Sequence, residues 1–185
     1  MNFLKKYWPI FVIFLLSLTP LFWFHDGMIL AGGDESILLN PGAMIKSTFW
    51  AWNPIFNGGN PVGDYQGNGA HLFPFIAFWF GLIKAGLSLI SIEKLWFVIT
   101  WFGTGLGIYF LAQVLIKDKA KANIFSIIVA SVYLFNIYIM QYVLMYTVRL
   151  PIMIMPWTLA LMIRGLENPE KKIRYAILLG IACVL

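Results

Sequence analysis

The sequence has few charged residues, two histidines and a single cysteine. Only 11% of its 185 residues are charged, whereas about 25% is usual in soluble domains. Cys183 has no second cysteine with which to form an intrachain disulfide, and it fits no metal-site spacing. The sequence contains no glycine-rich phosphate loop, no Ser/His/Asp order and no paired-cysteine motif. These absences exclude an ordinary soluble domain and leave nucleotide chemistry without support.

Long apolar runs are present instead. Hydrophobic residues make up 61% of the chain, and the uncharged runs 7–24, 95–116 and 122–148 reach or exceed the roughly 18 residues of a spanning-helix candidate. We therefore expect an all-α, polytopic transmembrane helical bundle. The expected spans are residues 7–24, 93–116, 123–143 and 147–163. A fifth apolar run, 175–185, is too short to span, which predicts that residues 1–185 are the N-terminal part of a longer transmembrane domain.

The first apolar run follows Lys5 and Lys6. It is interpreted as a retained signal anchor, because it is long for a signal peptide and no clear small-x-small cleavage site follows it; a cleaved signal peptide is the alternative. Between this run and the second span lies a long segment, 25–92, that is rich in turn formers. It is predicted to be an ordered external loop with juxtamembrane helices at about 42–52 and 72–90.

The distribution of basic residues predicts which side the loop faces. Nine of the thirteen Lys and Arg lie in three short clusters beside apolar runs, which indicates topology signals and not a nucleic-acid interface. If 72–90 does not cross the membrane, nine basic residues lie on one side and four on the other; if it crosses, the division is five against eight. The positive-inside rule favours the first arrangement, with a cytoplasmic N-terminus in the plasma membrane and an external loop.

Two adjacent acids, Asp34 and Glu35, lie in this loop within "LAGGDESILLNPG". A carboxylate at the outer surface can act as general base toward an attacking hydroxyl, and its neighbour can orient it or help to hold a divalent cation. The alternative is a solvated turn, since Gly-Gly-Asp is ordinary turn chemistry. Further candidates for the same site can hydrogen-bond sugar hydroxyls, although a plain loop is again the alternative. They are Asp64, Gln66, Asn68 and His71.

Arg149 stands at the start of the fourth predicted span. The uncharged stretch after it, 150–163, is only fourteen residues, so a full span must include the arginine. An ionisable residue at this depth is a functional-site hypothesis, and a guanidinium binds phosphate through two parallel hydrogen bonds. The alternative is that the side chain extends to the phospholipid headgroups.

The chain is predicted to begin with a span, followed by a large external loop that opens with an acidic motif and then by surface helices before the second span. This order, together with three local segments, resembles the GT-C superfamily of membrane glycosyltransferases. The segments are "GGDESILLNPG", "STFWAWNPIFNGGNPVGDYQGNGAHLFPFIAFWFGL" and "LPIMIMPWTLALMIRGL". They are similar to the arabinofuranosyltransferase-type branch, with the related YfhO-type membrane proteins a close second. The resemblance implies that Asp34 is the catalytic base, with Glu35 beside it. His71 stands where the family often has tyrosine.

The resemblance also implies a polyprenyl-phosphate sugar as donor and a glycan or lipid-linked acceptor. The chain is thus expected to be a glycosyltransferase acting on the extracytoplasmic face. The alternative is a non-enzymatic polytopic membrane protein, either a transporter or a cell-envelope assembly subunit.

Overall fold

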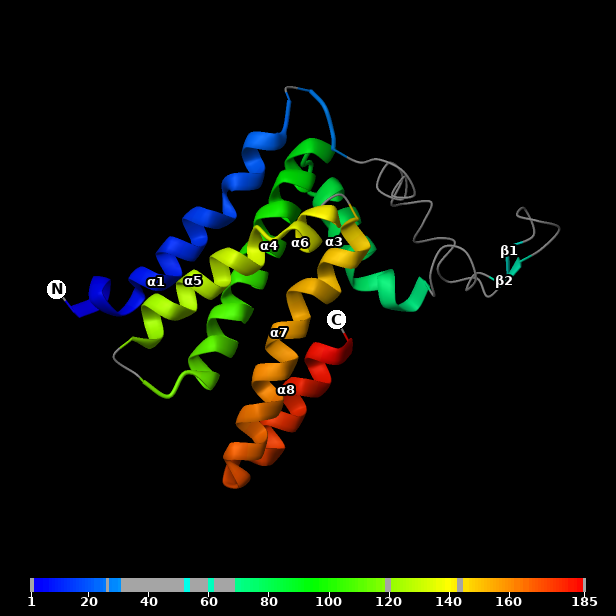
Figure 1. The fold of residues 1–185 in the computed structure, drawn as a ribbon. Coiled ribbons are helices and arrows are strands. Elements are labelled where there is room, and N and C mark those ends of the chain that lie inside the picture. Colours follow the sequence, from blue (N-terminus) through cyan, green and yellow to red (C-terminus); the bar gives the residue numbers. More distant parts are fainter. Residues whose placement is uncertain are drawn as a thin grey trace. The chain divides into compact units, whose positions relative to one another are not determined.

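The computed structural model is helical apart from one short strand pair (Figure 1). It describes residues 2–25, 27–30, 52–53, 60–61, 69–118, 121–142 and 145–184. The chain divides into two compact units, one formed by Met1–His25 with Lys94–Leu185 and the other by Asp26–Glu93. The all-helical character predicted from the apolar runs is thereby confirmed for the described residues, apart from the two-residue strands.

The first unit contains the long apolar helices. Its elements are α1 (Asn2–Ser17), the 3-10 helix η1 (Thr19–Trp23), most of α4 (Leu89–Leu115), α5 (Ala122–Leu134), α6 (Ile137–Gln141), α7 (Tyr146–Glu167), the 3-10 helix η3 (Pro169–Lys171) and α8 (Lys172–Val184). Three stretches are long and apolar enough to cross a membrane: Leu89–Leu115, Ala122–Gln141 and Val148–Glu167. The first predicted span, 7–24, is not among them: the apolar stretch Tyr7–Trp23 is shorter and is divided between α1 and η1. At 1.5 Å per residue, α4 is about 40 Å long, which exceeds the roughly 30 Å of a hydrocarbon core.

Helix α4 has glycines on two of its faces. A Cβ at Gly107 would lie 2.7 Å from the Trp157 ring of α7, and one at Gly103 would collide with Met153 of the same helix. A Cβ at Gly105 would instead meet Ile13 of α1 and Leu134 of α5. Small residues four apart let two helix backbones approach closely. The segment "GTGLG" therefore lets α7 pack on one side of α4, and α1 with α5 on the other.

Two boundaries differ from those predicted from the sequence. Helix α4 begins at Leu89 and not near residue 93, because the hydroxyl of Ser88 accepts the backbone N–H of Ser91 at 3.2 Å and caps the helix. The third predicted span, 123–143, is interrupted between α5 and α6. There the Asn136 side chain accepts the N–H of Ile139 at 3.0 Å and caps the start of a new helix. Hydrophobicity alone does not predict this interruption.

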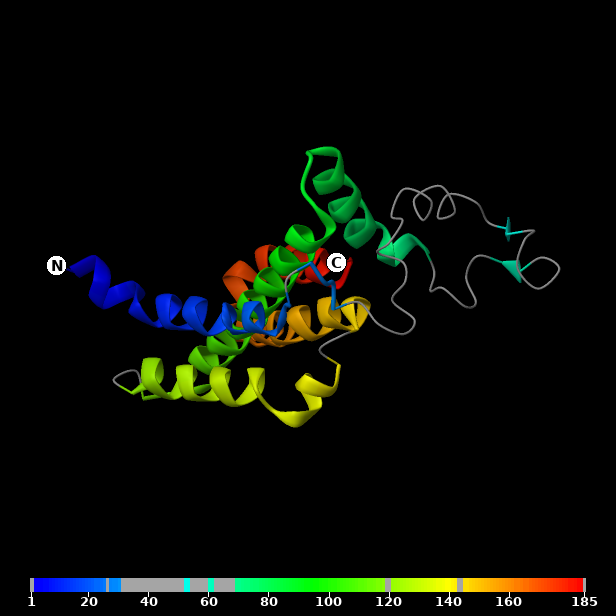
Figure 2. The same ribbon diagram turned by 90° about the horizontal axis from the view of Figure 1, so that it is seen from above.

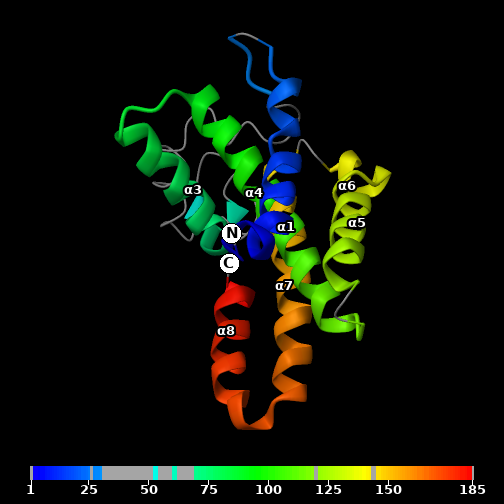
Figure 3. The ribbon, with the colours of Figure 1, turned by 90° about the vertical axis from the view of Figure 1, so that its left-hand side faces the viewer.

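The helices of the first unit run in alternating directions. Helices α1 and α5 lie side by side (Figures 1 and 2), and α7 with α8 forms an antiparallel hairpin (Figure 3). The C-terminal end of α4 and the start of α5 lie at the same end as the α7–α8 turn. Basic residues lie in these connections or in the adjoining helix turns, namely Lys117, Lys121, Arg164, Lys171, Lys172 and Arg174. The start of α7, with Arg149, lies at the opposite end.

The second unit contains α3 (Gly69–Lys84) and a two-residue antiparallel strand pair, β1 (Trp52–Asn53) with β2 (Asn60–Pro61). The predicted juxtamembrane helix at 72–90 is not continuous. Helix α3 ends at Lys84, and Gly86 follows with φ of +88°, a left-handed conformation that glycine adopts without a steric penalty. Residues 89 and 90 already belong to α4. The predicted helix near 42–52 lies outside the described residues, apart from Trp52 in β1.

Candidate functional site

Among the described residues of the first unit, Arg149 is the buried cation. It lies in the first turn of α7, and only 3% of its surface is exposed. Its backbone N–H donates to the carbonyl of Met145 at 3.2 Å, so the residue is held within the helix. The side chain does not extend to the surface, and the alternative of headgroup contact is therefore not what the structure shows.

The guanidinium of Arg149 lies on an aromatic surface provided by α4. Its Cζ is 3.3 Å from the centroid of the Phe97 ring and 5.4 Å from that of the Trp101 ring. Phe97 and Trp101 are four residues apart and therefore lie on one face of α4. The faces of aromatic rings carry negative charge density, and they attract a cation more strongly where water is excluded. The two rings thus offset part of the cost of burying this charge.

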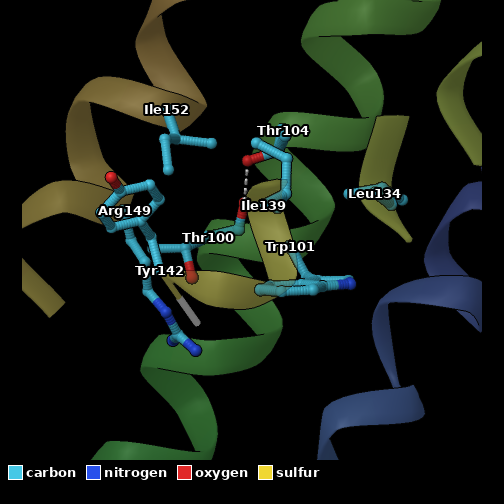
Figure 4. Close-up of a pocket in the computed structure, with 8 residues that line it drawn as sticks. All are labelled: Thr100, Trp101, Thr104, Leu134, Ile139, Tyr142, Arg149 and Ile152. Atoms are coloured by element: carbon cyan, nitrogen blue, oxygen red, sulfur yellow. Dashed lines mark hydrogen bonds between the residues drawn. The ribbon is translucent and has the colours of Figure 1, made fainter. Parts of the chain in front are cut away.

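A small cavity lies beside this arginine. Figure 4 shows its lining, which comes from α4, α5, α6, α7 and the residue after α6. The lining residues are Thr100, Trp101, Thr104, Leu134, Ile139, Tyr142, Arg149 and Ile152. Its volume of about 10 Å³ is close to the minimum for one water molecule. Pockets for small molecules typically measure about 300–1,000 Å³, so this cavity does not accommodate a sugar ring.

The two threonines of the cavity already use their protons. Thr100 Oγ1 donates to the carbonyl of Trp96 at 2.8 Å, and Thr104 Oγ1 donates to the carbonyl of Thr100 at 2.7 Å. A hydroxyl that donates to its own helix retains only its acceptor lone pairs. The guanidinium is therefore the charged donor of this site, and the chemistry that it suits is recognition of an oxyanion such as a phosphate.

The packing beside the site is held by Trp157 of α7. Its indole N–H donates to the carbonyl of Gly103 in α4 at 2.9 Å, and its ring stacks on that of Phe110 at 5.6 Å. This bond fixes α7 against the same helix that carries Phe97 and Trp101. The position of Arg149 over the Phe97 ring therefore depends on a hydrogen-bonded helix pair.

A second polar group joins α4 and α5. The hydroxyl of Tyr109 and the amide of Gln113 both donate to Oδ1 of Asn123, at 2.8 and 2.9 Å. The Gln113 amide also reaches Ser126 Oγ at 3.3 Å. Such bonds join helices in membranes. We assign this cluster to helix packing. None of the residues of this cluster was predicted from the sequence, although amide side chains inside apolar runs could have indicated it.

Most of the residues predicted from the sequence lie outside the described part of the chain. These are Asp34, Glu35, Asp64, Gln66 and Asn68. The backbone of His71 lies in the first turn of α3, and its side chain is not among those described. Within the described residues, no group of three or more His, Cys, Asp or Glu could hold a metal ion. The predicted carboxylate site and its divalent cation are therefore not tested by the structure.

Arg149 could be singled out from the sequence, but the residues around it could not. Phe97 and Trp101 belong to an ordinary apolar run, and their spacing is equally typical of core packing, so no signal separated them from other aromatics. Glu93 was also missed; it is an acid at the start of that run, and only 1% of its surface is exposed. A single acid beside a span was the available signal.

Comparison with models of protein families, with curated proteins and with solved structures gives no match for this chain. The resemblance to GT-C glycosyltransferases therefore depends on the short sequence segments alone. Function has to be argued from the residues themselves.

Proposed function

We propose that this chain is a multi-pass glycosyltransferase of the GT-C kind in the plasma membrane. It transfers a sugar from a polyprenyl-phosphate donor to a glycan or lipid-linked acceptor on the extracytoplasmic face. The observation that carries the proposal is the buried guanidinium of Arg149, which lies 3.3 Å from the Phe97 ring in the first turn of a helix long and apolar enough to span a membrane. A fixed cation at that place suits a phosphate that arrives from the bilayer.

The positions of the basic turns support the proposed orientation. The connections with Lys117, Lys121 and Lys171 and the last turn of α7, which contains Arg164, lie at one end of the first unit, and the start of α7 lies at the other. Since short cytoplasmic loops are enriched in Lys and Arg, the basic end is cytoplasmic in this proposal. Arg149 then lies toward the outer face, where lipid-linked sugars are the donors that the sequence resemblance implies.

The proposed reaction is a displacement at the anomeric carbon. Asp34 takes the proton of an acceptor hydroxyl, and the hydroxyl oxygen forms a bond to the anomeric carbon with inversion. The bond between that carbon and the phosphate oxygen breaks, and the polyprenyl phosphate leaves with the electron pair. Arg149 stabilises the negative charge that develops on the departing phosphate.

Polar residues of the loop complete the proposal. Glu35 orients Asp34 or shares a divalent cation with it. Asp64, Gln66, Asn68 and His71 are proposed to bind the hydroxyls of donor and acceptor. These assignments follow from residue type and from position in the sequence.

The proposal is tested by in vitro transfer with full-length protein and a panel of polyprenyl-phosphate sugars. Asp34→Asn is expected to abolish transfer while expression and membrane insertion stay normal, because the amide cannot accept the proton. Asp118→Asn makes the same chemical change in the connection after α4 and is expected to retain activity. Normal transfer by Asp34→Asn would refute the assignment. If the wild-type protein transfers none of the sugars, the non-enzymatic transporter or assembly subunit becomes the better explanation.

A further inference from the structure

Two aromatic residues at the end of the first apolar run pack against the rings that contact Arg149. The Trp23 ring lies 6.1 Å from the Phe97 ring and 5.5 Å from the Trp101 ring, at interplanar angles of 79° and 84°. The Phe24 ring lies 5.3 Å from that of Phe97, at 80°. Aromatic pairs favour such near-perpendicular arrangements. All five residues belong to the first unit, so the end of the first run and α7 both reach the same two side chains of α4.

The Trp23 contacts restrict the two rings on which the guanidinium lies. Phe97 and Trp101 could occupy other side-chain rotamers unless neighbouring groups filled the space beside them. Trp101 belongs to the buried hydrophobic cluster against which Trp23 packs. The attraction between a cation and a ring depends on where the charge lies over the ring face. A ring that turned away would therefore move the most favourable position for the Arg149 guanidinium.

The first apolar run makes another contact of this kind with α4. Phe14 of α1 packs edge-on against Phe102 at 5.6 Å and 87°. Phe102 directly follows Trp101 in the sequence, so the two side chains point to different faces of the helix. The Phe14 contact thus joins the first run to α4 at a face other than the one formed by Phe97 and Trp101. It provides a natural comparison for Trp23.

We infer that Trp23 is a positioning residue for Arg149, and that the first apolar run is thereby part of the proposed phosphate site. Trp23 holds the Phe97 and Trp101 rings in the orientation that receives the guanidinium, and it acts through these rings. Such support matters because a functional group must be held within about 0.5 Å of its productive position. The effect on Arg149 is independent of enzymatic function, whereas the effect on transfer rests on the proposed function.

The effect on Arg149 is measured by NMR of full-length protein with isotope-labelled arginine side chains. The Arg149 signal is the one that Arg149→Leu removes, and the Phe97 ring current is expected to shift it away from the signal of the partly exposed Arg164. Trp23→Leu is expected to reduce this shift. Trp23→Phe, which keeps a ring, and the matched control Phe14→Leu are expected to preserve it.

The effect on transfer is measured by a double-mutant cycle. Trp23→Leu is expected to lower transfer on the order of tenfold when Arg149 is present, and to lower it no further in the Arg149→Leu background. A residue needed only for folding would lower transfer by the same factor in both backgrounds, because independent effects add in free energy. Trp23→Phe is expected to retain most of the activity, and Phe14→Leu is expected to leave transfer unchanged.

The two measurements can overturn separate parts of the inference. An unchanged Arg149 signal in Trp23→Leu refutes the positioning role, whether or not the protein is an enzyme. An equal loss of transfer in the two backgrounds refutes the contribution of Trp23 to transfer through Arg149. If the wild-type protein transfers no sugar, the proposed function fails, and the NMR signal alone decides whether Trp23 positions Arg149.

Two further measurements protect the test against failure of the first variant. Should Trp23→Leu not accumulate, Trp23→Met takes its place in both experiments, because methionine also lacks a ring and fills irregular space. Mass spectrometry of the purified protein is expected to find the first apolar run retained. A purified protein that lacks this run would refute the inference, because Trp23 would then be absent from the site.

Discussion

Helix α7 has an arginine near each end, and the two lie in opposite environments. Arg149, in its first turn, is 3% exposed and lies 3.3 Å above the Phe97 ring. The side chain of Arg164, in its last turn, is 34% exposed and lies 3.8 Å from the Glu167 carboxylate. The chemical group and the helix are the same, and only the surroundings differ.

This difference in burial changes how strongly each arginine can interact with a charged group. Water and salt screen a partly exposed pair such as that of Arg164, and pairs of this type contribute little to stability. A buried guanidinium interacts more strongly with charges, because the dielectric around it is low. In the proposed function, Arg149 therefore binds the anionic donor, and Arg164 is one of the basic residues that set the orientation of the chain in the membrane.

The largest expected effect is that of Arg149→Leu. Transfer is expected to fall on the order of a hundred- to a thousandfold, as for the loss of one transition-state donor. The free energy of unfolding is expected to change little, because loss of the contact with the Phe97 ring and removal of a buried charge act in opposite directions. Activity assays and thermal unfolding in detergent measure the two effects. Loss of transfer together with a large loss of stability would mean that Arg149 is needed for folding and not for binding of the donor.

A smaller effect is expected from Phe97→Leu, which removes the ring under the guanidinium. A desolvated cation–π contact is worth about 2 kcal/mol, or up to roughly thirtyfold in transfer. Phe102→Leu is the matched control, since Phe102 packs edge-on against Phe14 at 5.6 Å. Its loss is expected to lower stability by about 0.5–1.5 kcal/mol with transfer unchanged. Equal activity in the two variants would show that the Phe97 ring does not position Arg149.

The smallest effect is expected from Arg164→Gln. The change removes an exposed pair, so the free energy of unfolding is expected to fall by about 0–1 kcal/mol, with transfer unchanged. Accessibility labelling is expected to place the α7–α8 turn on the same side of the membrane as in the wild-type protein, because neighbouring basic residues remain. A tenfold loss of transfer would remove the distinction between the two arginines.

The long helices could be predicted because each is encoded locally. Uninterrupted apolar runs predicted the regions of α4, of α5 with α6, and of α7. Boundaries were less accurate where one polar side chain decides them. The Ser88 cap moves the start of α4, and Asn136 divides the third predicted span. Such caps depend on the local backbone as well as on residue type.

The candidate site could be predicted only in part. The fourteen apolar residues after Arg149 were enough to show that the arginine belongs to a helix long enough to span. They contained no information on Phe97, which lies 52 positions earlier on another helix. Likewise, the composition of the run around Glu93 did not reveal that Leu30 is its partner.

The sequence by itself therefore determined the helical character of the described residues and three of the four segments that were expected to span, because hydrophobic length is a property of consecutive residues. Tertiary structure decided that the guanidinium is buried on an aromatic ring and that Glu93 holds a distant loop. These contacts arise when helices and loops pack together, and packing joins residues whose separation in the sequence carries no signal.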